Sequence, residues 1–410
     1  MALETPTTNA AAETAEDRLD DLRPGGEEAW PFYAEDEVDA VAAVMRSGKV
    51  NQWTGPEVFA FEQEYTQAFG GGHGIALING SVALELPLRA FGIGPGDEVV
   101  VTPRSFVASA FCVRLLGGTP VFADVDPDSG NMTPASIEAV LTPRTRAIIP
   151  VHLAGWPCDM PAIMDLARSR GLKVIEDCAQ SHGATIGGRP AGSFGDAAAY
   201  SFCQDKILST GGEGGFVTFQ DKAAYDWAWS FKDHGKNRET MNQPGGEPGI
   251  FRWVHDAVGT NWRMPGLQAA IGIAQLRKLP SWTETRTRNA AIWAEALSAV
   301  PGLRVPLPAE GLRHAFYKFY AYVDAPAEEA SVLRREILRR TAAAGLRVFS
   351  GSCSEMYREQ AFADLPVAPL PNAHQLGESS LMVEVHPTLD PSRLARRADA
   401  LAAIARDVLG

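Results

Sequence analysis

Short apolar runs alternate with amphipathic stretches along the middle of the chain, between about residues 72 and 220. The runs are four to six residues long and rich in Val, Ile, Ala and Phe, which is typical of strands buried on both faces of a sheet. Strands and helices that alternate in this way predict an α/β fold with a mostly parallel sheet. The expected strands are 98–102, 120–125, 146–151, 173–177, 197–202 and 216–219, and helices are expected at 105–116, 134–141 and 161–170.

The pattern changes on both sides of this region. Residues 1–28 contain eight acidic and two basic side chains and few large apolar ones, so we expect a flexible acidic leader. Residues 234–262 are rich in Gly and Pro, and a loop of this length is more often functional than accidental. Two long helices follow it, and the later elements are a strand at 316–323 and helices at 331–344 and 391–408. We therefore expect a large ligand-binding domain over 29–280 and a small C-terminal α/β domain over 281–410.

Composition narrows the class of protein further. The 410 residues are 45% hydrophobic and 21% charged, with a net charge of −13. Because an acidic body repels nucleic acid and anionic membranes, we expect neither as a partner. No apolar run is long enough to span a membrane, and the N-terminus lacks the features of a secretory signal. The five cysteines form no CxxC pair, so we expect neither a disulfide framework nor a metal site. This composition predicts a soluble, cytoplasmic enzyme.

Two positions at predicted element ends are candidates for ligand binding. Gly80 and Ser81 begin a helical stretch, and the free N–H groups of a helix N-terminus suit a phosphate, although such a start is usually only a cap. Asp177 ends an apolar strand, where open α/β sheets place functional groups. Its carboxylate either caps a turn or keeps a heterocyclic nitrogen protonated.

A lysine beside a glycine cluster is the strongest single signal. Lys206 follows a buried strand and precedes TGGEGG, where glycine lets the backbone approach a ligand closely. An amine enclosed there would suit covalent bonding to a carbonyl. Phe106 either stacks on a flat ring or belongs to the core, and Asn261 either donates to a phosphate or caps the next helix. Together these groups supply a phosphate cradle, a ring-stacking aromatic, an acid and an amine, which are the parts that pyridoxal 5′-phosphate (PLP) requires.

From about residue 30 to 390 the chain resembles the DegT-type (DegT/StrS) sugar aminotransferases, which are PLP-dependent enzymes of fold type I. The resemblance implies a mostly parallel, seven-stranded sheet sandwiched by helices, with the PLP site in the large domain. The matching phrases are NGSVALEL, GIGPGDEVVVTPRSFVASA, PVFADVD, TPRTRAIIPVHLAGWPCDM, VIEDCAQSHGA, GSFGDAAAYSF, TGGEGG and TNWRMPGLQAAIG.

The same resemblance implies a residue for each part of the cofactor. Lys206 would bond to the cofactor aldehyde and then move a proton between the donor substrate and the cofactor. Asp177 would pair with the pyridine nitrogen, Gln180 would contact the ring hydroxyl, and Phe106 would lie on the ring face. The phosphate would be bound by Gly80, Ser81, Ser201 and, from the neighbouring subunit, Asn261. An obligate homodimer with active sites at its interface follows from the last of these roles.

The resemblance also implies the reaction, in which an amino acid such as glutamate gives its amino group to a keto-sugar, expected to be nucleotide-linked, in amino-sugar biosynthesis. Related dehydratases carry His where this chain keeps Lys206, which favours transamination. The cluster HAFYKFYAY makes His314, Tyr317 and Lys318 candidates for the substrate site, or else part of an amphipathic strand that faces solvent. Two alternatives stay open: a keto-cyclitol or another secondary-metabolite ketone as acceptor, and a non-catalytic regulatory protein that senses PLP or sugar.

Overall fold

A computed structural model describes residues 28–243 and 251–410, so most of the predicted acidic leader lies outside the described residues. In the described part, the main sheet has seven strands in the order β1-β9-β8-β5-β4-β2-β3. The ladder from β8 to β3 is parallel, whereas β9 runs antiparallel to both β1 and β8. The predicted, mostly parallel α/β sheet is therefore confirmed. Its strands are β1 His73–Leu77, β2 Glu98–Val101, β3 Thr119–Phe122, β4 Thr145–Ile149, β5 Lys173–Asp177, β8 Ala197–Ser201 and β9 Gly215–Phe219.

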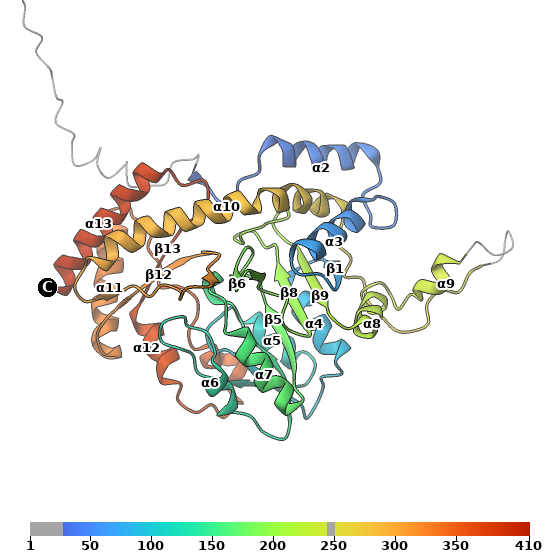
Figure 1. The fold of residues 1–410 in the computed structure, drawn as a ribbon, viewed down its shortest axis with the longest axis horizontal. Coiled ribbons are helices and arrows are strands. Elements are labelled where there is room, and N and C mark those ends of the chain that lie inside the picture. Colours follow the sequence, from blue (N-terminus) through green and yellow to red (C-terminus); the bar gives the residue numbers. More distant parts are fainter. Residues whose placement is uncertain (1–27, 244–250) are drawn as a thin grey trace, which may run out of the picture.

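Helices cover both faces of this sheet (Figure 1). Alternate residues of β8 belong to different cores, because side chains of a strand point to opposite faces. Ala197 and Ala199 lie in the core with α4 (Gly80–Ala90), α5 (Ala108–Arg114) and α8 (Lys222–Lys232). Ala198 and Tyr200 lie in the core on the other face, with α3 (Glu57–Ala68) and the start of α10 (Gly266–Ser298). Farther along that second face, α6 (Pro134–Glu138) and α7 (Met160–Arg170) cover β4 and β5.

A second hydrophobic core lies beyond the main sheet, around the second half of α10. It includes a small sheet in the order β10-β12-β13 and the helices α11 and α13. The predicted boundary between residues 280 and 281 falls inside α10. This single helix, with Pro280 inside it, stands where the sequence predicts two long helices. The remaining elements are α2 Glu35–Ser47, α11 Ala327–Ala343, α12 Pro371–Ser379, α13 Pro391–Leu409, β10 Leu303–Arg304, β12 Phe319–Val323 and β13 Ser380–Val383, with a further sheet of β6 Thr185–Ile186, β7 Arg189–Pro190 and β11 Leu312–Arg313, and the 3-10 turns η2 Leu153–Gly155, η3 Met356–Arg358 and η4 Gln360–Phe362.

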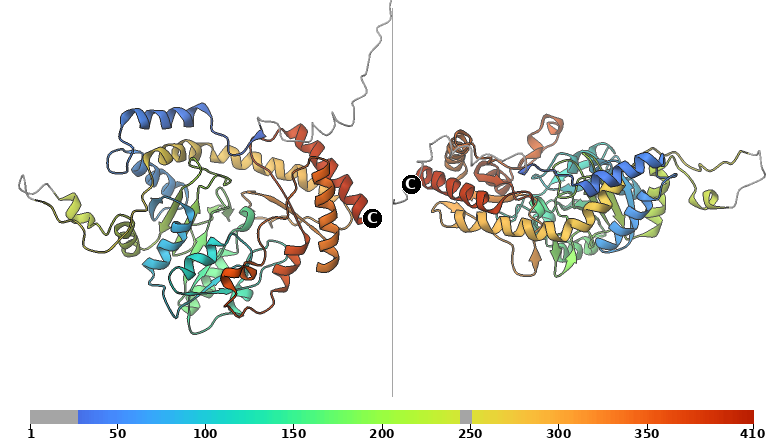
Figure 2. Two further views of the ribbon diagram at one scale, coloured as in Figure 1. Left: turned by 180° about the vertical axis from the view of Figure 1, so that it is seen from behind. Right: turned by 90° about the horizontal axis from the view of Figure 1, so that it is seen from above.

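The segment predicted as a long functional loop leaves the body of the molecule. It begins after α8, contains the short helix α9 (Arg238–Asn242) and returns before α10, and residues 244–250 of it lie outside the described part. In Figures 1 and 2, α9 lies well away from the main sheet. Phe251 and Trp253, in the part of this segment that returns to the body, are 70% and 83% exposed. We call residues 233–243 and 251–262 the arm.

None of the helices in the described ranges is both long and apolar enough to cross a membrane, and this includes the 33-residue α10.

Candidate active site

A cavity of about 640 Å³ opens at the carboxyl end of the parallel strands. Each of four candidates stands at the end of a strand or just after it: Gly80 follows β1, Phe106 follows β2, Asp177 ends β5 and Ser201 ends β8. The carboxyl ends of parallel strands meet at one edge of a sheet. The fold therefore brings together side chains that are far apart in the sequence. The predicted residues that line this cavity are Gly80, Ser81, Phe106, Asp177, Gln180, Ser201, Lys206 and Tyr317.

One end of the cavity is formed by the first turn of α4 and the end of β8. The side chain of Asn79 caps α4 by accepting a hydrogen bond from the N–H of Val82 (3.0 Å). A Cβ atom on Gly80 would lie 2.6 Å from Cβ of Ser201, so only glycine permits this approach of helix to strand. The arrangement places the positive end of a helix and a serine hydroxyl beside the same space, which suits an anion such as phosphate.

Asp177 forms the floor of the cavity between β5 and α5. Its carboxylate is buried and accepts hydrogen bonds from Ser109 Oγ (2.8 Å) and from the N–H of Ala179 (3.1 Å). Burial raises the pKa of Asp177, against the opposing effects of these two hydrogen bonds and of the charge on Lys206. A cationic donor in the cavity would stabilise this carboxylate, because an ion pair offsets the desolvation of a buried charge.

Lys206 lies opposite, in the turn that follows β8. Its Nζ atom is 3.4 Å from Tyr317 Oη and 3.4 Å from Asp205 Oδ1, and only 15% of its side chain is exposed. Trp30 fixes the backbone of this turn, because its indole N–H donates to the Lys206 carbonyl oxygen (2.9 Å). Asp177 and Lys206 thus face a common cavity, which is the arrangement that the predicted cofactor site requires.

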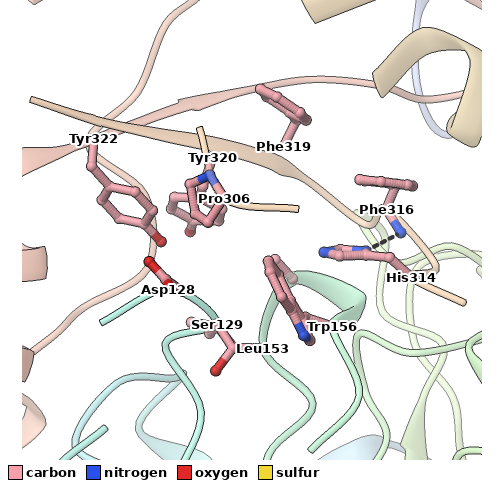
Figure 3. A pocket seen from close by; sticks show the side chains of 11 residues that line it. Asp128, Ser129, Leu153, Trp156, Pro306, His314, Phe316, Phe319, Tyr320 and Tyr322 are labelled. Carbon is pink, nitrogen blue, oxygen red and sulfur yellow. Dashed lines mark hydrogen bonds between the residues drawn. The ribbon is translucent and has the colours of Figure 1, made fainter. Parts of the chain in front are cut away.

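Three of the predicted site residues lie outside this cavity. Asn261 is exposed at the base of the arm, where it pairs with Asp233 in an isolated β-bridge. His314 lines a separate small pocket, where its ring stacks on Phe316 (Figure 3). Lys318 has its Nζ atom 3.7 Å from Glu384 Oε1. Within one chain, Asn261 and His314 lie apart from the other candidates, whereas Lys318 lies behind the cavity wall, with its Nζ atom 5.3 Å from the centre of the Tyr317 ring.

Sequence reasoning missed three side chains that hold the site together. Ser109 supports Asp177, Asp205 contacts Lys206, and Trp30 fixes the backbone at Lys206. Asp205 had a signal, because it is adjacent to the candidate lysine. Ser109 lies in the first turn of α5, eight residues after the end of β2, and Trp30 is far away in the sequence, so their positions depend on tertiary packing.

Comparison with known proteins decides the family. A sequence profile of the DegT/DnrJ/EryC1/StrS aminotransferase family matches residues 31–402. The chain belongs to this family. A solved aminotransferase from Psychrobacter cryohalolentis is 46% identical, with a TM-score of 0.88 over 93% of this chain and 99% of that one. The present chain is 38% identical over 337 residues to UDP-N-acetyl-3-dehydro-α-D-glucosamine 3-aminotransferase of Acidithiobacillus ferrooxidans, and the aligned part covers 82% of this chain and 85% of the relative. It is 37% identical over 344 residues to GDP-perosamine synthase of Caulobacter vibrioides, covering 83% and 87%.

This DegT/DnrJ/EryC1/StrS aminotransferase is PLP-dependent, as the sequence predicted. Its cavity fits that cofactor on geometric grounds. A Cβ on Gly80 would clash with Ser201, so glycine lets the first turn of α4 and the Ser201 hydroxyl meet at the end of the cavity that suits a phosphate. The buried Asp177 offers an anion to a ring N–H, and the shielded amine of Lys206 faces the same space.

Proposed function

We propose that this aminotransferase moves an amino group from glutamate to a keto-sugar that is carried on a nucleotide. The observation that carries the proposal is the cavity that Lys206, Asp177 and the first turn of α4 share. The choice of acceptor is supported by the relatives, whose names give UDP-linked and GDP-linked amino sugars. Glutamate as the donor is a prediction from the family resemblance.

Each residue that lines the cavity has a proposed role that follows from its position. Gly80, Ser81 and Ser201 hold the phosphate, and Asp177, oriented by Ser109, keeps a proton on the ring nitrogen. Gln180 accepts a hydrogen bond from the N–H of Ala154 through Oε1 (2.7 Å), which leaves its amide N–H₂ for the ring hydroxyl. Phe106 is 67% exposed at the cavity wall, where a ring ligand would cover it.

Lys206 performs the proton transfer in this proposal. PLP, when bound, supplies an electron sink that stabilises negative charge on a substrate carbon. Lys206 Nζ would take the proton from that carbon of the donor and pass it to the cofactor, and it would carry a proton in the opposite direction, from the cofactor to the acceptor carbon, when the acceptor is aminated. The low exposure of the lysine limits competing exchange with water.

We also propose a homodimer in which Asn261 of one subunit reaches the phosphate in its partner. Its exposed position at the base of the arm supports this role, because it lies outside the cavity of its own chain. In the same proposal residues 29–280 form the PLP-binding domain and residues 281–410 the smaller domain.

The proposal is tested first on Lys206. Purified protein reconstituted with PLP should retain a cofactor absorption band on desalting, and borohydride should fix the cofactor on Lys206. Lys206→Ala should abolish both the fixation and turnover, with Lys222→Ala on the exposed face of α8 as the matched control. A Lys206→Ala protein with full activity would contradict the mechanism.

The acceptor is tested separately. Enzyme loaded with pyridoxamine 5′-phosphate should react with nucleotide-linked keto-sugars faster than with keto-cyclitols, as measured by the absorbance change in a single turnover. Faster reaction with keto-cyclitols would replace the proposed acceptor. No reaction with any ketone, in protein that binds PLP, would favour the regulatory alternative.

A further inference from the structure

The chain makes a strained turn just before β12, beside the cavity. Phe316 has φ +47°, in the left-handed region that bulky residues rarely adopt. Its N–H donates to His314 Nδ1 (2.7 Å), and the rings of the two residues stack at 4.1 Å in a pocket away from the active site (Figure 3). Arg286 Nη1 donates to the Phe316 carbonyl oxygen (3.2 Å), and the next residue, Tyr317, donates its N–H to Ala154 (2.8 Å). Strain held by several contacts is typical of functional sites.

The turn sends successive side chains in different directions. His314 and Phe316 line the small pocket, whereas Tyr317 lines the large cavity. We had expected an amphipathic strand from residue 316, but the strand begins only at Phe319. The strained residue thus serves to point Tyr317 at the turn that carries Lys206.

At that turn the Tyr317 hydroxyl lies between a carboxylate and an amine. Tyr317 Oη donates to Asp205 Oδ2, and Lys206 Nζ is 3.4 Å from Tyr317 Oη and 4.9 Å from the centre of its ring. Burial and the neighbouring Asp205 carboxylate raise the pKa of Tyr317, so the phenol keeps its proton. Burial opposes ionisation of Asp205 as well, but Lys206, the Tyr317 hydroxyl and Lys318 together lower its pKa.

The protonation states fix the direction of each hydrogen bond. The phenol donates its only proton to the ionised Asp205, so its oxygen lone pairs are left for Lys206 to donate to. Lys318 Nζ lies 5.3 Å from the centre of the Tyr317 ring. The other charged groups that line the cavity are Asp177 on β5, Glu213 before β9 and Glu359 beside η3.

We propose that Asp205 and Tyr317 form a resting position for the Lys206 amine whenever it is not bonded to the cofactor, an inference that rests on the proposed role of Lys206. A free lysine side chain samples many rotamers, and fixing it in one of them costs conformational entropy. An acceptor already in place keeps Nζ beside the cavity between successive proton transfers. Asp205 and Tyr317 are positioning residues, because they act through Lys206.

The first test uses protein without cofactor. Reductive methylation with formaldehyde and cyanoborohydride, followed by peptide mass spectrometry, measures how readily Lys206 reacts. In Tyr317→Phe and in Asp205→Asn the lysine should react about three to ten times faster, the size of one lost hydrogen bond. Tyr225→Phe on α8 is the matched control, because its hydroxyl accepts from Arg238 (2.8 Å) away from the cavity, and Lys222 is the internal reference.

The second test uses the loaded enzyme. Tyr317→Phe should lower kcat about tenfold and leave KM for the amino donor within about twofold, because the phenol acts on the lysine and not on the substrate. The double variant should lose no more than the more severe single variant, since both changes remove one unit. If Tyr317→Phe does not fold, Asp205→Asn carries both measurements.

Three outcomes would overturn the inference. Labelling of Lys206 that is unchanged in both variants would show that its amine does not rest there. A raised KM with unchanged labelling would make Tyr317 a substrate contact. Additive losses of kcat in the double variant would show that Asp205 and Tyr317 act independently and not as one unit. Failure of the proposed function is recognised independently, by turnover in Lys206→Ala.

Discussion

His182 is a buried ring with no hydrogen-bond partner for either nitrogen among the described residues. It lies among the aromatic rings of Tyr65, Phe69, Tyr200 and Phe202. Burial, together with the positive charges of Lys206 and Arg286, lowers the pKa of His182 to about 3. The ring is therefore neutral in the folded protein throughout the range in which an unfolded histidine takes up a proton.

This residue makes stability depend on pH in a definable direction. Between about pH 6.5 and pH 3 the unfolded state binds a proton at His182 and the folded state does not, so stability falls as the pH falls. His182→Phe should flatten this dependence by about 1.4 kcal/mol per pH unit well below pH 6.5. Urea unfolding of the cofactor-free protein and the variant at several pH values between 7.5 and 4.5 measures the difference. Parallel curves would mean that His182 is protonated in the folded state.

At the residue scale, the chemistry of the site was predictable where it depends on residue type and position. Lys206, Asp177 and Gly80 stand at the ends of apolar runs or beside glycines, and the structure places all three at one cavity. Asp205 and Ser109 carry no such pattern, because an acid or a serine at those positions is compatible with an ordinary turn or helix. The contact of Ser109 with Asp177 arises only when β5 and α5 come together, and that of Asp205 with Tyr317 only when the segment before β12 packs against the lysine turn.

The segment just before α2 has no regular secondary structure, but it holds the lysine turn in place. Trp30 donates its indole N–H to the Lys206 carbonyl oxygen, and its ring contacts Trp282 edge to face at 5.2 Å. Arg286 lies 5.1 Å from the centre of the same ring. Close by, the Tyr33 hydroxyl lies 3.0 Å from Ser209 Oγ. The segment thus joins the lysine turn to α10.

Trp30→Phe keeps an aromatic ring for Arg286 and removes the hydrogen bond to Lys206. We expect a loss of about 1–2 kcal/mol in the free energy of unfolding and faster amide exchange in residues 203–209. Chemical denaturation and hydrogen exchange by mass spectrometry measure both effects. Trp227→Phe on α8 is the matched control, and equal exchange in the two variants would show that Trp30 does not hold the turn.

Among elements, those with strong periodicity were predicted and those that depend on long-range partners were not. The runs at 173–177 and 197–202 became β5 and β8, with one residue of difference. Apolar runs do not encode strand direction, so the antiparallel β9 was not foreseen. β1, α3 and α12 were missed, since their apolar positions are few or mixed with Gly and polar residues, and α8 was missed although its apolar positions recur at helical spacing. The helix expected at 105–116 is only Ala108–Arg114, because the residues before it turn to line the cavity.

At the scale of the whole molecule, the proposed dimer can be tested by mixing two inactive proteins. Lys206→Ala lacks the amine, and Asn261→Ala lacks the proposed phosphate contact from the partner. If Asn261 serves the opposite subunit, a mixed dimer contains one site with both defects and one intact site. Random exchange of subunits should then restore about a quarter of the wild-type activity.

The outcome distinguishes the two arrangements. If Asn261 served its own chain, every site of the mixed dimer would be defective and activity would stay at the level of the separate variants. Denaturation and refolding of each protein alone is the control, because it shows the activity that refolding itself returns.

The helix α10 belongs to the core beneath α3 and also to the core around β12 and β13. Its 33 residues form one continuous helix, about 50 Å long at ~1.5 Å per residue, so it joins the two halves without an intervening loop. Chimeras built to exchange the C-terminal part between relatives should therefore cross over before Gly266. A crossover at residue 280 would combine half-helices that evolved against different neighbours on both sides, and each chimera would inherit two mismatched interfaces.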